Sequence, residues 1–257
     1  MKIISYNING IRSGINKGLL HWIKSYQPDV LCLQEIKASK EQIKTSLFDH
    51  LGYYHYWFPS TKRKGYSGVG ILCKEKPHHI EYGIGIESID TEGRVLRIDL
   101  KKISVISLYL PSGKHLSNRL NFKFYFMENF FSYIKKIQKK LKDLVICGDY
   151  NICHHEIDIH DPIRNRNISG FLPEERKWMS NFLNLGFIDS FRNYVKEANH
   201  YSWWSYYSNA KKNNKGWRID YAMVSRSLKK KMNKAYLLPE IPYSDHCPTV
   251  LEIEINK

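Results

Sequence analysis

The chain has 257 residues, too many for a peptide or a metal-stapled mini-domain, and this length suits one large domain or two small ones. Apolar residues make up 42% and charged residues 25%, which is ordinary for a soluble folded protein and excludes wholesale disorder. Forty Lys and Arg against 25 Asp and Glu give a net charge of +15 and a pI near 9.4. This charge favours a polyanionic partner such as nucleic acid, although an AT-rich genome could enrich lysine without any binding role.

Neither a membrane span nor a secretory signal is predicted. The longest nearly continuous apolar run, Ile103–Leu110, falls well short of the roughly 20 residues that cross a bilayer. The first residues, Met1–Asn7, turn polar too soon for the apolar core of about 7–15 residues in a secretory signal. The five cysteines form no C-x-x-C pair, so we interpret them as free thiols rather than as disulfides or a zinc site. We therefore expect a cytosolic protein that has no contact with a membrane.

Strand-like runs alternate with helices, and no linker, repeat or low-complexity tract separates them. Several runs are β-branched and almost continuously apolar, as strands covered on one or both faces are. In chain order the expected strands are Lys2–Tyr6, Val30–Leu33, Gly68–Cys73, Val95–Leu100, Ser104–Leu110, Leu144–Cys147, Ile219–Val224 and Thr249–Ile255.

Three helices are expected between these strands. The first begins at the capping box Ser39-x-x-Gln42, and the third begins at Pro173 and ends before Gly186. The second is long and follows Ser117. Its expected apolar face consists of Leu120, Phe124, Phe131, Ile134 and Leu141. The mixture predicts a single α/β domain over residues 1–257, with sheets inside and helices outside.

Polar side chains follow the ends of several expected strands. If these ends meet at one rim, the side chains share one site, which comprises Asn7, Asn9, Glu35, Tyr109, Asp149, Asn151, Asp220, Asp245 and His246. Taken singly, an Asp or Asn after a strand is more often a turn residue or a helix cap than a ligand. Together, carboxylates and amides suit a hard divalent cation and lack the His- and Cys-rich character of a zinc site. The same set suits phosphoryl transfer to water, in which a metal and hydrogen-bond donors stabilise charge on the phosphate.

A series of motifs carries a family resemblance. In chain order it includes Ser5-Tyr6-Asn7-Ile8-Asn9-Gly10, Leu33-Gln34-Glu35-Ile36-Lys37, Gly148-Asp149-Tyr150-Asn151, Gly216-Trp217-Arg218-Ile219-Asp220-Tyr221 and Ser244-Asp245-His246. Over essentially the whole chain, this series resembles the exonuclease III family of abasic-site endonucleases, within the endonuclease/exonuclease/phosphatase superfamily. The resemblance implies a four-layer α/β sandwich, two mixed β-sheets flanked by helices, with the active site at one rim.

The resemblance also implies a role for each site residue. Mg²⁺, or Mn²⁺ in its place, would be held mainly by Glu35, with support from Asn7, Asp149, Asn151 and Asp245. Some relatives carry Asp at the position of Asn9, and a neutral amide binds Mg²⁺ more weakly than a carboxylate does. The residues implied in catalysis are Tyr109, Asp149, Asn151, Asp220 and His246.

Individual roles follow for the catalytic group. Asp149 would orient or deprotonate the attacking water, or protonate the leaving group, and Asn151 would hold that water or a phosphate oxygen. His246 would contact the scissile phosphate while Asp220 orients its ring. Tyr109 would touch the same phosphate.

The implied partner is double-stranded DNA that contains abasic sites. Lys37, Tyr66, Arg94 and Asn165 would lie near the duplex backbone. Trp203 and Trp217 would wall a pocket for the flipped abasic sugar, which loses little stacking when it is extruded. The protein would act as a monomer, associated with the nucleoid if it is bacterial.

The leading hypothesis is thus a Mg²⁺-dependent DNA-repair nuclease that cuts 5′ to abasic sites and also trims 3′ ends. An alternative is another phosphodiesterase or phosphatase of the superfamily, acting on RNA or on a phosphorylated small molecule. A hypothesis of a different class is a catalytically silent nucleic-acid-binding protein. That hypothesis requires losses among the site residues, yet Glu35, Asp149, Asn151, Asp220 and His246 are all present.

Overall fold

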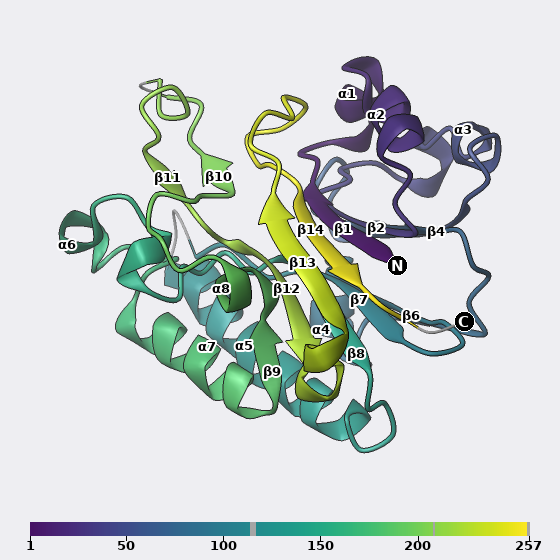
Figure 1. The fold of residues 1–257 in the computed structure, drawn as a ribbon. Coiled ribbons are helices and arrows are strands. Elements are labelled where there is room, and N and C mark those ends of the chain that lie inside the picture. Colours follow the sequence, from purple (N-terminus) through teal and green to yellow (C-terminus); the bar gives the residue numbers. More distant parts are fainter. Residues whose placement is uncertain (114–116, 208, 256–257) are drawn as a thin grey trace.

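The computed structural model describes residues 1–113, 117–207 and 209–255. Within these residues, two six-stranded sheets pack face to face (Figure 1). The first sheet contains β1 (Lys2–Asn7), β2 (Val30–Gln34), β3 (Tyr54–Phe58), β4 (Val69–Cys73), β13 (Met232–Leu237) and β14 (Thr249–Ile253), in the order β13-β14-β1-β2-β4-β3. The second contains β5 (His79–Tyr82), β6 (Val95–Asp99), β7 (Ser104–Tyr109), β8 (Leu144–Asp149), β9 (Phe187–Asp189) and β12 (Asp220–Ser225), in the order β5-β6-β7-β8-β12-β9.

Helices cover the outer face of each sheet. The first sheet packs against α1 (Ile11–Asn16), α2 (Leu19–Tyr26) and α3 (Ser46–Asp49). The second packs against α4 (Glu87–Asp90), α5 (Ser117–Ile137) and α7 (Pro173–Asn184), and α8 (Ser190–Tyr194) lies beside β12 and β13. The order helix, sheet, sheet, helix confirms the four-layer α/β sandwich.

Burial on both faces explains the continuous apolar runs of the strands. Along β2, Val30 and Cys32 point into the core between the sheets, while Leu31 and Leu33 point towards the helices. The same alternation holds in β8, because successive side chains of a strand point to opposite faces. A strand covered on both faces needs apolar residues at every position.

Strand register decides where the polar residues meet. Each sheet contains one parallel pair, β1 with β2 and β7 with β8, and parallel strands end at the same rim. Tyr109 lies opposite Asp149 in the second sheet, and Asp149 in turn lies opposite Asp220 at the start of the antiparallel β12. The parallel pair of the first sheet ends with Asn7 opposite Gln34, directly before Glu35.

The eight strands expected from the sequence are confirmed, each beginning and ending within two residues of its expected position. The helix expected at Ser39 is wrong: Lys40–Gln42 form a single 3₁₀ turn, η1, although the backbone N–H of Ser39 does donate to the Gln42 side chain over 3.1 Å. The long helix α5 ends at Ile137, so Leu141 lies outside it.

Other expectations concern the chain as a whole. All five cysteines are free and buried. In the described part of the chain, no helix combines the length and the apolar character that a membrane crossing requires. The single domain remains a prediction, although strands from both ends of the chain meet in the first sheet.

Candidate active site

Asn7 connects the two sheets at the rim where the polar residues gather. Its side-chain nitrogen donates to Glu35 Oε1 over 2.8 Å and to Asp149 Oδ2 over 2.9 Å. Its oxygen accepts the backbone N–H of Asn9 over 3.1 Å, and the side chain is fully buried. One amide therefore holds carboxylates from two different sheets at a single point.

Several residues that follow the strand ends have left-handed backbone. The φ angles are 49° at Asn9, 51° at Glu35, 49° at Lys37 and 50° at Asn151. Residues other than glycine seldom adopt this conformation, which costs of order 1–3 kcal/mol and clusters at functional sites. At Glu35 the segment after β1 stabilises this backbone conformation, because the carbonyl of Glu35 accepts the N–H of Gly10 over 2.8 Å. These backbone conformations place the Lys37 side chain in contact with those of Asn9 and Glu35, and the Glu35 side chain in contact with that of Asn7.

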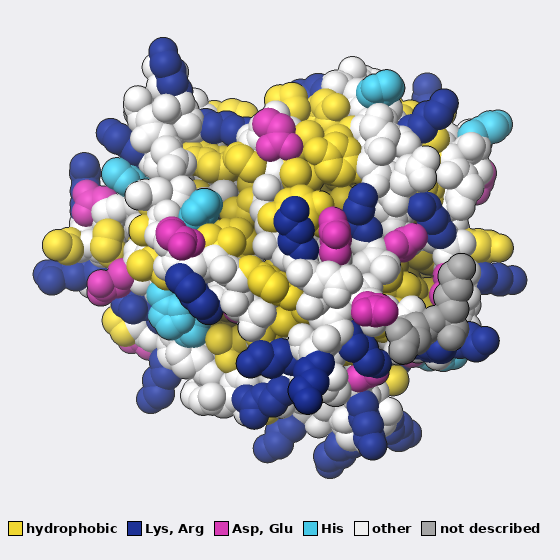
Figure 2. Space-filling model, in the orientation of Figure 1, with side chains coloured by type: hydrophobic (Ala, Val, Ile, Leu, Met, Phe, Trp, Pro, Cys, Tyr) yellow, Lys and Arg dark blue, Asp and Glu magenta, His cyan; other side chains and the backbone are white. Residues whose placement is uncertain are grey.

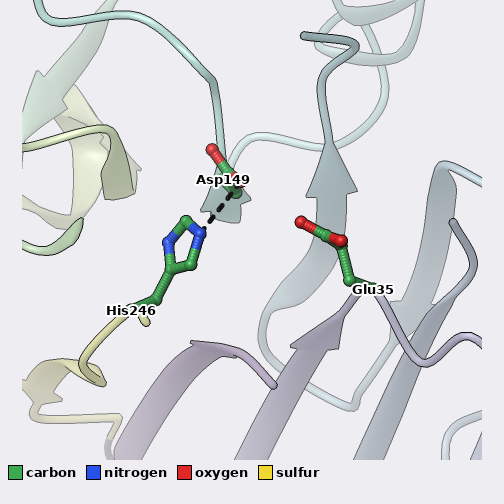
Figure 3. A group of neighbouring side chains, drawn as sticks. All are labelled: Glu35, Asp149 and His246. Carbon is green, nitrogen blue, oxygen red and sulfur yellow. Dashed lines mark ion pairs between the residues drawn. The ribbon is translucent and has the colours of Figure 1, made fainter. Parts of the chain in front are cut away.

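His246 approaches the carboxylates from the loop before β14. Its Nδ1 donates to Asp220 Oδ2 over 2.9 Å, and its Nε2 lies 3.8 Å from Asp149 Oδ2 (Figure 3). Ser202 fixes Asp220 by donating to the same oxygen over 2.7 Å. Burial lowers the pKa of His246, but the negative charge and the hydrogen bond of Asp220 outweigh it and raise this pKa to about 10. The imidazole is therefore a cation near neutral pH.

The pKa values of the two central carboxyls move in opposite directions. Burial, followed by the charge of Asp220, raises the pKa of Asp149 to about 7 against the opposing effect of His246. Burial also acts to raise the pKa of Glu35, but Lys37, whose Nζ lies 2.7 Å from Glu35 Oε2, gives a net lowering. Glu35 is therefore ionised near neutral pH, and Asp149 is close to its titration point.

The cluster has the donor set of a metal site. Glu35, Asp149 and His246 offer ligand atoms that lie within 4.8 Å of one another (Figure 3). His246 is protonated and bound to Asp220, which leaves the carboxylate oxygens as the natural ligands. Oxygen ligands suit a hard divalent cation. A cation here would also relieve the burial and repulsion that raise the pKa of Asp149, so the residues fit such an ion.

The remaining expected ligands lie beside this cluster. Asp245 accepts from the side chain of Asn9 over 2.8 Å and from Trp203 Nε1 over 2.9 Å, so both of its oxygens have donors. Asn151 donates its backbone N–H to Asp149 Oδ1 over 2.8 Å and its side-chain nitrogen to the carbonyl of Leu110 over 2.9 Å. Both residues border the same cavity as the central carboxylates. Their contact with a metal remains a prediction.

A cavity of about 150 Å³ opens beside the cluster. It is lined by Glu35, Tyr109, Ser112, Asp149, Asn151, Ser169, Gly170, Trp203, Trp217, Ile219, Asp245 and His246. Trp203 and Trp217 pair across the short strands β10 (Trp203–Trp204) and β11 (Gly216–Trp217), with edge-to-face rings whose centroids are 6.0 Å apart. Gly170 has φ +105°, and a Cβ there would lie 2.6 Å from the Trp217 ring. A glycine at this position lets the indole pack against the loop.

The residues expected to contact DNA are placed differently from one another. Lys37 donates to Asn9 Oδ1 over 2.5 Å as well as pairing with Glu35, and is partly exposed. Asn165 is half-buried in α6 (Pro162–Asn165), and its side chain donates to the backbone carbonyls of His160 and Asp161. DNA contact by Lys37, Tyr66 and Asn165 remains a prediction.

Arg94 differs from the others because it is only 1% exposed. Its guanidinium donates to Glu92 over 2.7 Å, to the Tyr66 hydroxyl over 2.9 Å and to the Tyr109 carbonyl over 3.0 Å. It also lies over the Tyr109 ring, 4.6 Å from the centroid. This burial does not support a direct contact with a duplex backbone; it supports a role in positioning Tyr66 and Tyr109. Burial and the charge of Glu35 raise the pKa of Tyr109 well above its usual value, so this phenol stays neutral.

Sequence reasoning missed a buried ion pair beneath the cavity. Lys123 of α5 and Glu175 of α7 are both fully buried, with Nζ and Oε1 2.6 Å apart. Lys123 also donates to the carbonyl of Asn151 over 2.8 Å, and Glu175 Oε2 accepts the N–H of Gly170 over 2.6 Å. The signal was a lysine within an aromatic stretch of α5, because a charged side chain among buried aromatics requires a partner. Ser202, which fixes Asp220, gave no such signal.

Sequence comparison places this geometry in a known family. The profile of the Endonuclease/Exonuclease/phosphatase family matches residues 4–246. The chain belongs to this family. A Bacillus subtilis exodeoxyribonuclease is 40% identical over 257 residues, covering 99% of this chain and all of the relative. The Danio rerio DNA repair nuclease APEX1 is 37% identical, covering 99% of this chain and 83% of the relative.

Structural comparison agrees with the sequence comparison. The AP endonuclease from Archaeoglobus fulgidus superposes with a TM-score of 0.91 at 29% identity, covering 99% of this chain and all of that one. The resemblance stated from the motifs is confirmed. Within the family the chain is an enzyme of the exonuclease III and AP endonuclease group.

Proposed function

We propose that the protein is a DNA-repair nuclease that uses Mg²⁺ to hydrolyse the phosphodiester 5′ to abasic sites in duplex DNA, and that it also trims 3′ ends. The observation that carries this proposal is the cavity of about 150 Å³ beside Asp149 and His246. Pockets for drug-sized ligands occupy about 300–1,000 Å³. The smaller volume suits a sugar without its base better than a complete nucleotide. Because a baseless sugar loses little stacking on extrusion, such a pocket selects the lesion.

The relatives support the same substrate. They include an exodeoxyribonuclease, a DNA repair nuclease and an AP endonuclease, and the match extends over nearly the whole chain. The net charge of +15 agrees with a polyanionic substrate.

The side chains have complementary roles in the proposed reaction. The imidazolium of His246, held by Asp220, donates a hydrogen bond to the scissile phosphate and stabilises the charge that develops there. Asp149, with its pKa near 7, takes a proton from the attacking water, and Asn151 holds that water. Mg²⁺ held by Glu35 and Asp149, with Asn7, Asn151 and Asp245 around it, would supply positive charge to the phosphate oxygens, and Mn²⁺ would serve in its place.

One gel experiment tests this function. Labelled duplexes carry an abasic analogue, a recessed 3′ end or neither, and each is incubated with Mg²⁺ or with EDTA. Wild type should cut 5′ to the abasic position in the presence of Mg²⁺ and should not cut in EDTA. Glu35→Gln should need more Mg²⁺ for half activity, whereas the exposed control Glu128→Gln should behave as wild type. Equal cutting of all three duplexes, or hydrolysis of RNA or a phosphorylated small molecule without abasic cleavage, would contradict the proposal.

A further inference from the structure

The rim opposite the candidate active site is rich in positive charge. Strands β7, β8 and β12 run between the two rims, and each carries a site residue at one end: Tyr109, Asp149 and Asp220. Each of these strands has six residues. A strand of that length spans about 17–20 Å, so the far rim is roughly that distance from the site.

Three segments meet at the far rim: the turn between β6 and β7, the linker between α5 and β8, and the 3₁₀ turn η3 (Arg226–Lys231). We call their cationic residues the basic end. It consists of Lys101, Lys102, Lys139, Lys140, Lys142, Arg226, Lys229, Lys230 and Lys231, all exposed.

Contacts join the three segments into one surface. A shallow hollow of about 340 Å³ is lined by Lys101, Lys102, Lys140 and Lys142 of the first two segments, and also by Asp99 and Asp143. Ser227 joins η3 to the linker by hydrogen bonds to the carbonyl of Lys142 over 3.0 Å and to Asp143 over 2.7 Å. Figure 2 shows Lys and Arg side chains gathered along the lower part of the drawn face.

Acidic residues offset only part of this charge. Asp143 lies 3.7 Å from the Lys231 ammonium, and Glu75 accepts the backbone N–H of Lys101 over 3.0 Å. At the catalytic rim, by contrast, cations are held by carboxylates: Lys37 by Glu35, and Arg94 by Glu92. The nine exposed cations of the basic end outnumber the acidic residues beside them, so this rim presents net positive charge to solvent, where a polyanion can replace its counterions.

We propose that the basic end is a second nucleic-acid-binding surface, which takes a segment of duplex DNA separate from the segment in the active site. The choice of duplex DNA rests on the proposed function. At physiological salt the Debye length is about 8 Å, so charges some 17–20 Å from the catalytic rim act weakly on a duplex bound there. The lysines need direct contact with phosphates instead. Such contacts carry no sequence information, so the second segment is bound without sequence preference.

A capture experiment tests the second surface. The active site is filled with a short duplex that carries an uncleavable abasic analogue, and the binding of a second, labelled, undamaged duplex is then measured. The test variant is Lys142→Glu/Lys229→Glu/Lys230→Glu. Its matched control is Lys24→Glu/Lys177→Glu/Lys196→Glu, which reverses three exposed lysines outside the basic end.

Wild type and control should capture the second duplex, and the test variant should bind it at least about 10-fold more weakly. The slope of log affinity against log salt should fall by about 0.9 for each phosphate that a lysine no longer neutralises, so by about 2–3 in the test variant. No capture by filled wild type, or equal capture by the test variant and the control, would overturn the inference.

A separate measurement keeps this inference distinct from the proposed function. All three proteins should cleave a short abasic duplex at similar rates, and a parallel loss of cleavage in the test variant would mean that the basic end belongs to the catalytic surface. If no protein cleaves abasic DNA, the proposed function fails. Weaker equilibrium binding of undamaged duplex by the test variant than by the control would still support the second surface.

Discussion

The side-chain nitrogen of Asn7 lies between Glu35 and Asp149 and donates to both carboxylates. Together with the hydrogen bond from His246 to Asp220, it joins the two sheets in one site. A hydrogen bond to an ionised carboxylate is worth about 1.5–3 kcal/mol, more than an ordinary one, and this holds for Glu35 near neutral pH and for Asp149 once it has lost its proton. Both the folding and the metal affinity of the rim should therefore depend on Asn7.

Asn7→Ala should lower the free energy of unfolding by about 3 kcal/mol without metal, because Glu35 and the buried Asp149 lose their shared donor. Mg²⁺ should narrow the gap to wild type, since a bound cation satisfies the same oxygens. Urea unfolding at pH 7, with and without Mg²⁺, measures both effects, and the exposed Asn233→Ala serves as the control. A gap that Mg²⁺ leaves unchanged would place the metal elsewhere.

Asp149→Asn and His246→Ala should each lower single-turnover cleavage by at least about 10²-fold, the usual scale for acid–base groups. Affinity for abasic duplex should change much less, since most of it comes from phosphate contacts. If affinity collapses while the bound-state rate stays normal, these residues are binding groups.

The pKa values set the expected pH profile of the same reaction. Activity should rise through about pH 7 as Asp149 loses its proton, and fall above about pH 10 as His246 loses its own. Higher Mg²⁺ should move the lower limb to lower pH, because a cation stabilises the carboxylate. Measuring kcat/KM against pH at two Mg²⁺ concentrations checks both limbs.

Trp217→Ala should narrow the preference for abasic over undamaged duplex by about 1–3 kcal/mol, because it removes one wall of the cavity. Raising salt should weaken both substrates alike, since backbone contacts do not distinguish them. The comparison is kcat/KM for each duplex at two salt concentrations, with Trp204→Phe as a control because Trp204 is buried and does not line the cavity. If the preference for abasic duplex is unchanged in Trp217→Ala, Trp217 does not select the lesion, and Trp203 is the next residue to test.

Glu175→Gln should destabilise the fold by about 3–5 kcal/mol, because it leaves the buried ammonium of Lys123 without its counter-charge. Lys123→Met combined with Glu175→Leu should recover part of that stability by removing both charges. Urea unfolding of Lys123→Met, Glu175→Leu and the double variant measures the coupling between the two residues. Single variants whose effects simply add would show that the pair acts as two independent groups.

Asp158 should make the fold sensitive to acid. Burial acts to raise its pKa, but Arg218 at 2.8 Å and Arg192 at 2.7 Å lower it to about 2 from the usual value of 3.8. A lowered pKa means that the ion pairs stabilise the fold fully above about pH 4, and that this stability is lost as the pH falls towards 2. The loss should be about 2 kcal/mol. Asp158→Asn should be less stable than wild type at pH 7, and the gap should shrink by most of that amount at pH 2.5.

The strands that carry the site could be predicted because they are buried on both faces and therefore apolar throughout. The edge strands β3, β5 and β13 were missed, because each contains exposed or half-exposed polar and aromatic residues and lacks a continuous apolar run. Helices α1 and α2 were missed because they are short and separated by Gly18. In α5 the residues expected on the buried face were partly wrong. Aromatics occupy every face of this helix, and the buried ones include Phe126, Phe130 and Tyr133.

The members of the site could be predicted from strand ends and motifs, but its internal connections could not. Sequence spacing does not show that Asn7 bridges two sheets, that Lys37 neutralises Glu35, or that Arg94 lies beneath Tyr109. Those contacts depend on register between strands that are distant along the chain. They also depend on left-handed backbone at Glu35 and Lys37. Glutamate and lysine seldom adopt this conformation, so the residue types did not predict it.

The left-handed backbone at Glu35, Lys37 and Asn151 costs folding stability but places side chains of the proposed site. Glycine would adopt these φ angles at lower cost, so it would relieve strain at positions whose side chains we propose to act in the reaction or in DNA binding. Selection for heat resistance alone would therefore favour glycine wherever the relieved strain exceeds the lost side-chain contacts, and would remove the proposed functional groups. Stabilising substitutions in this protein should therefore leave these three residues unchanged and be placed instead in the edge strands of the two six-stranded sheets, which contain no glycine.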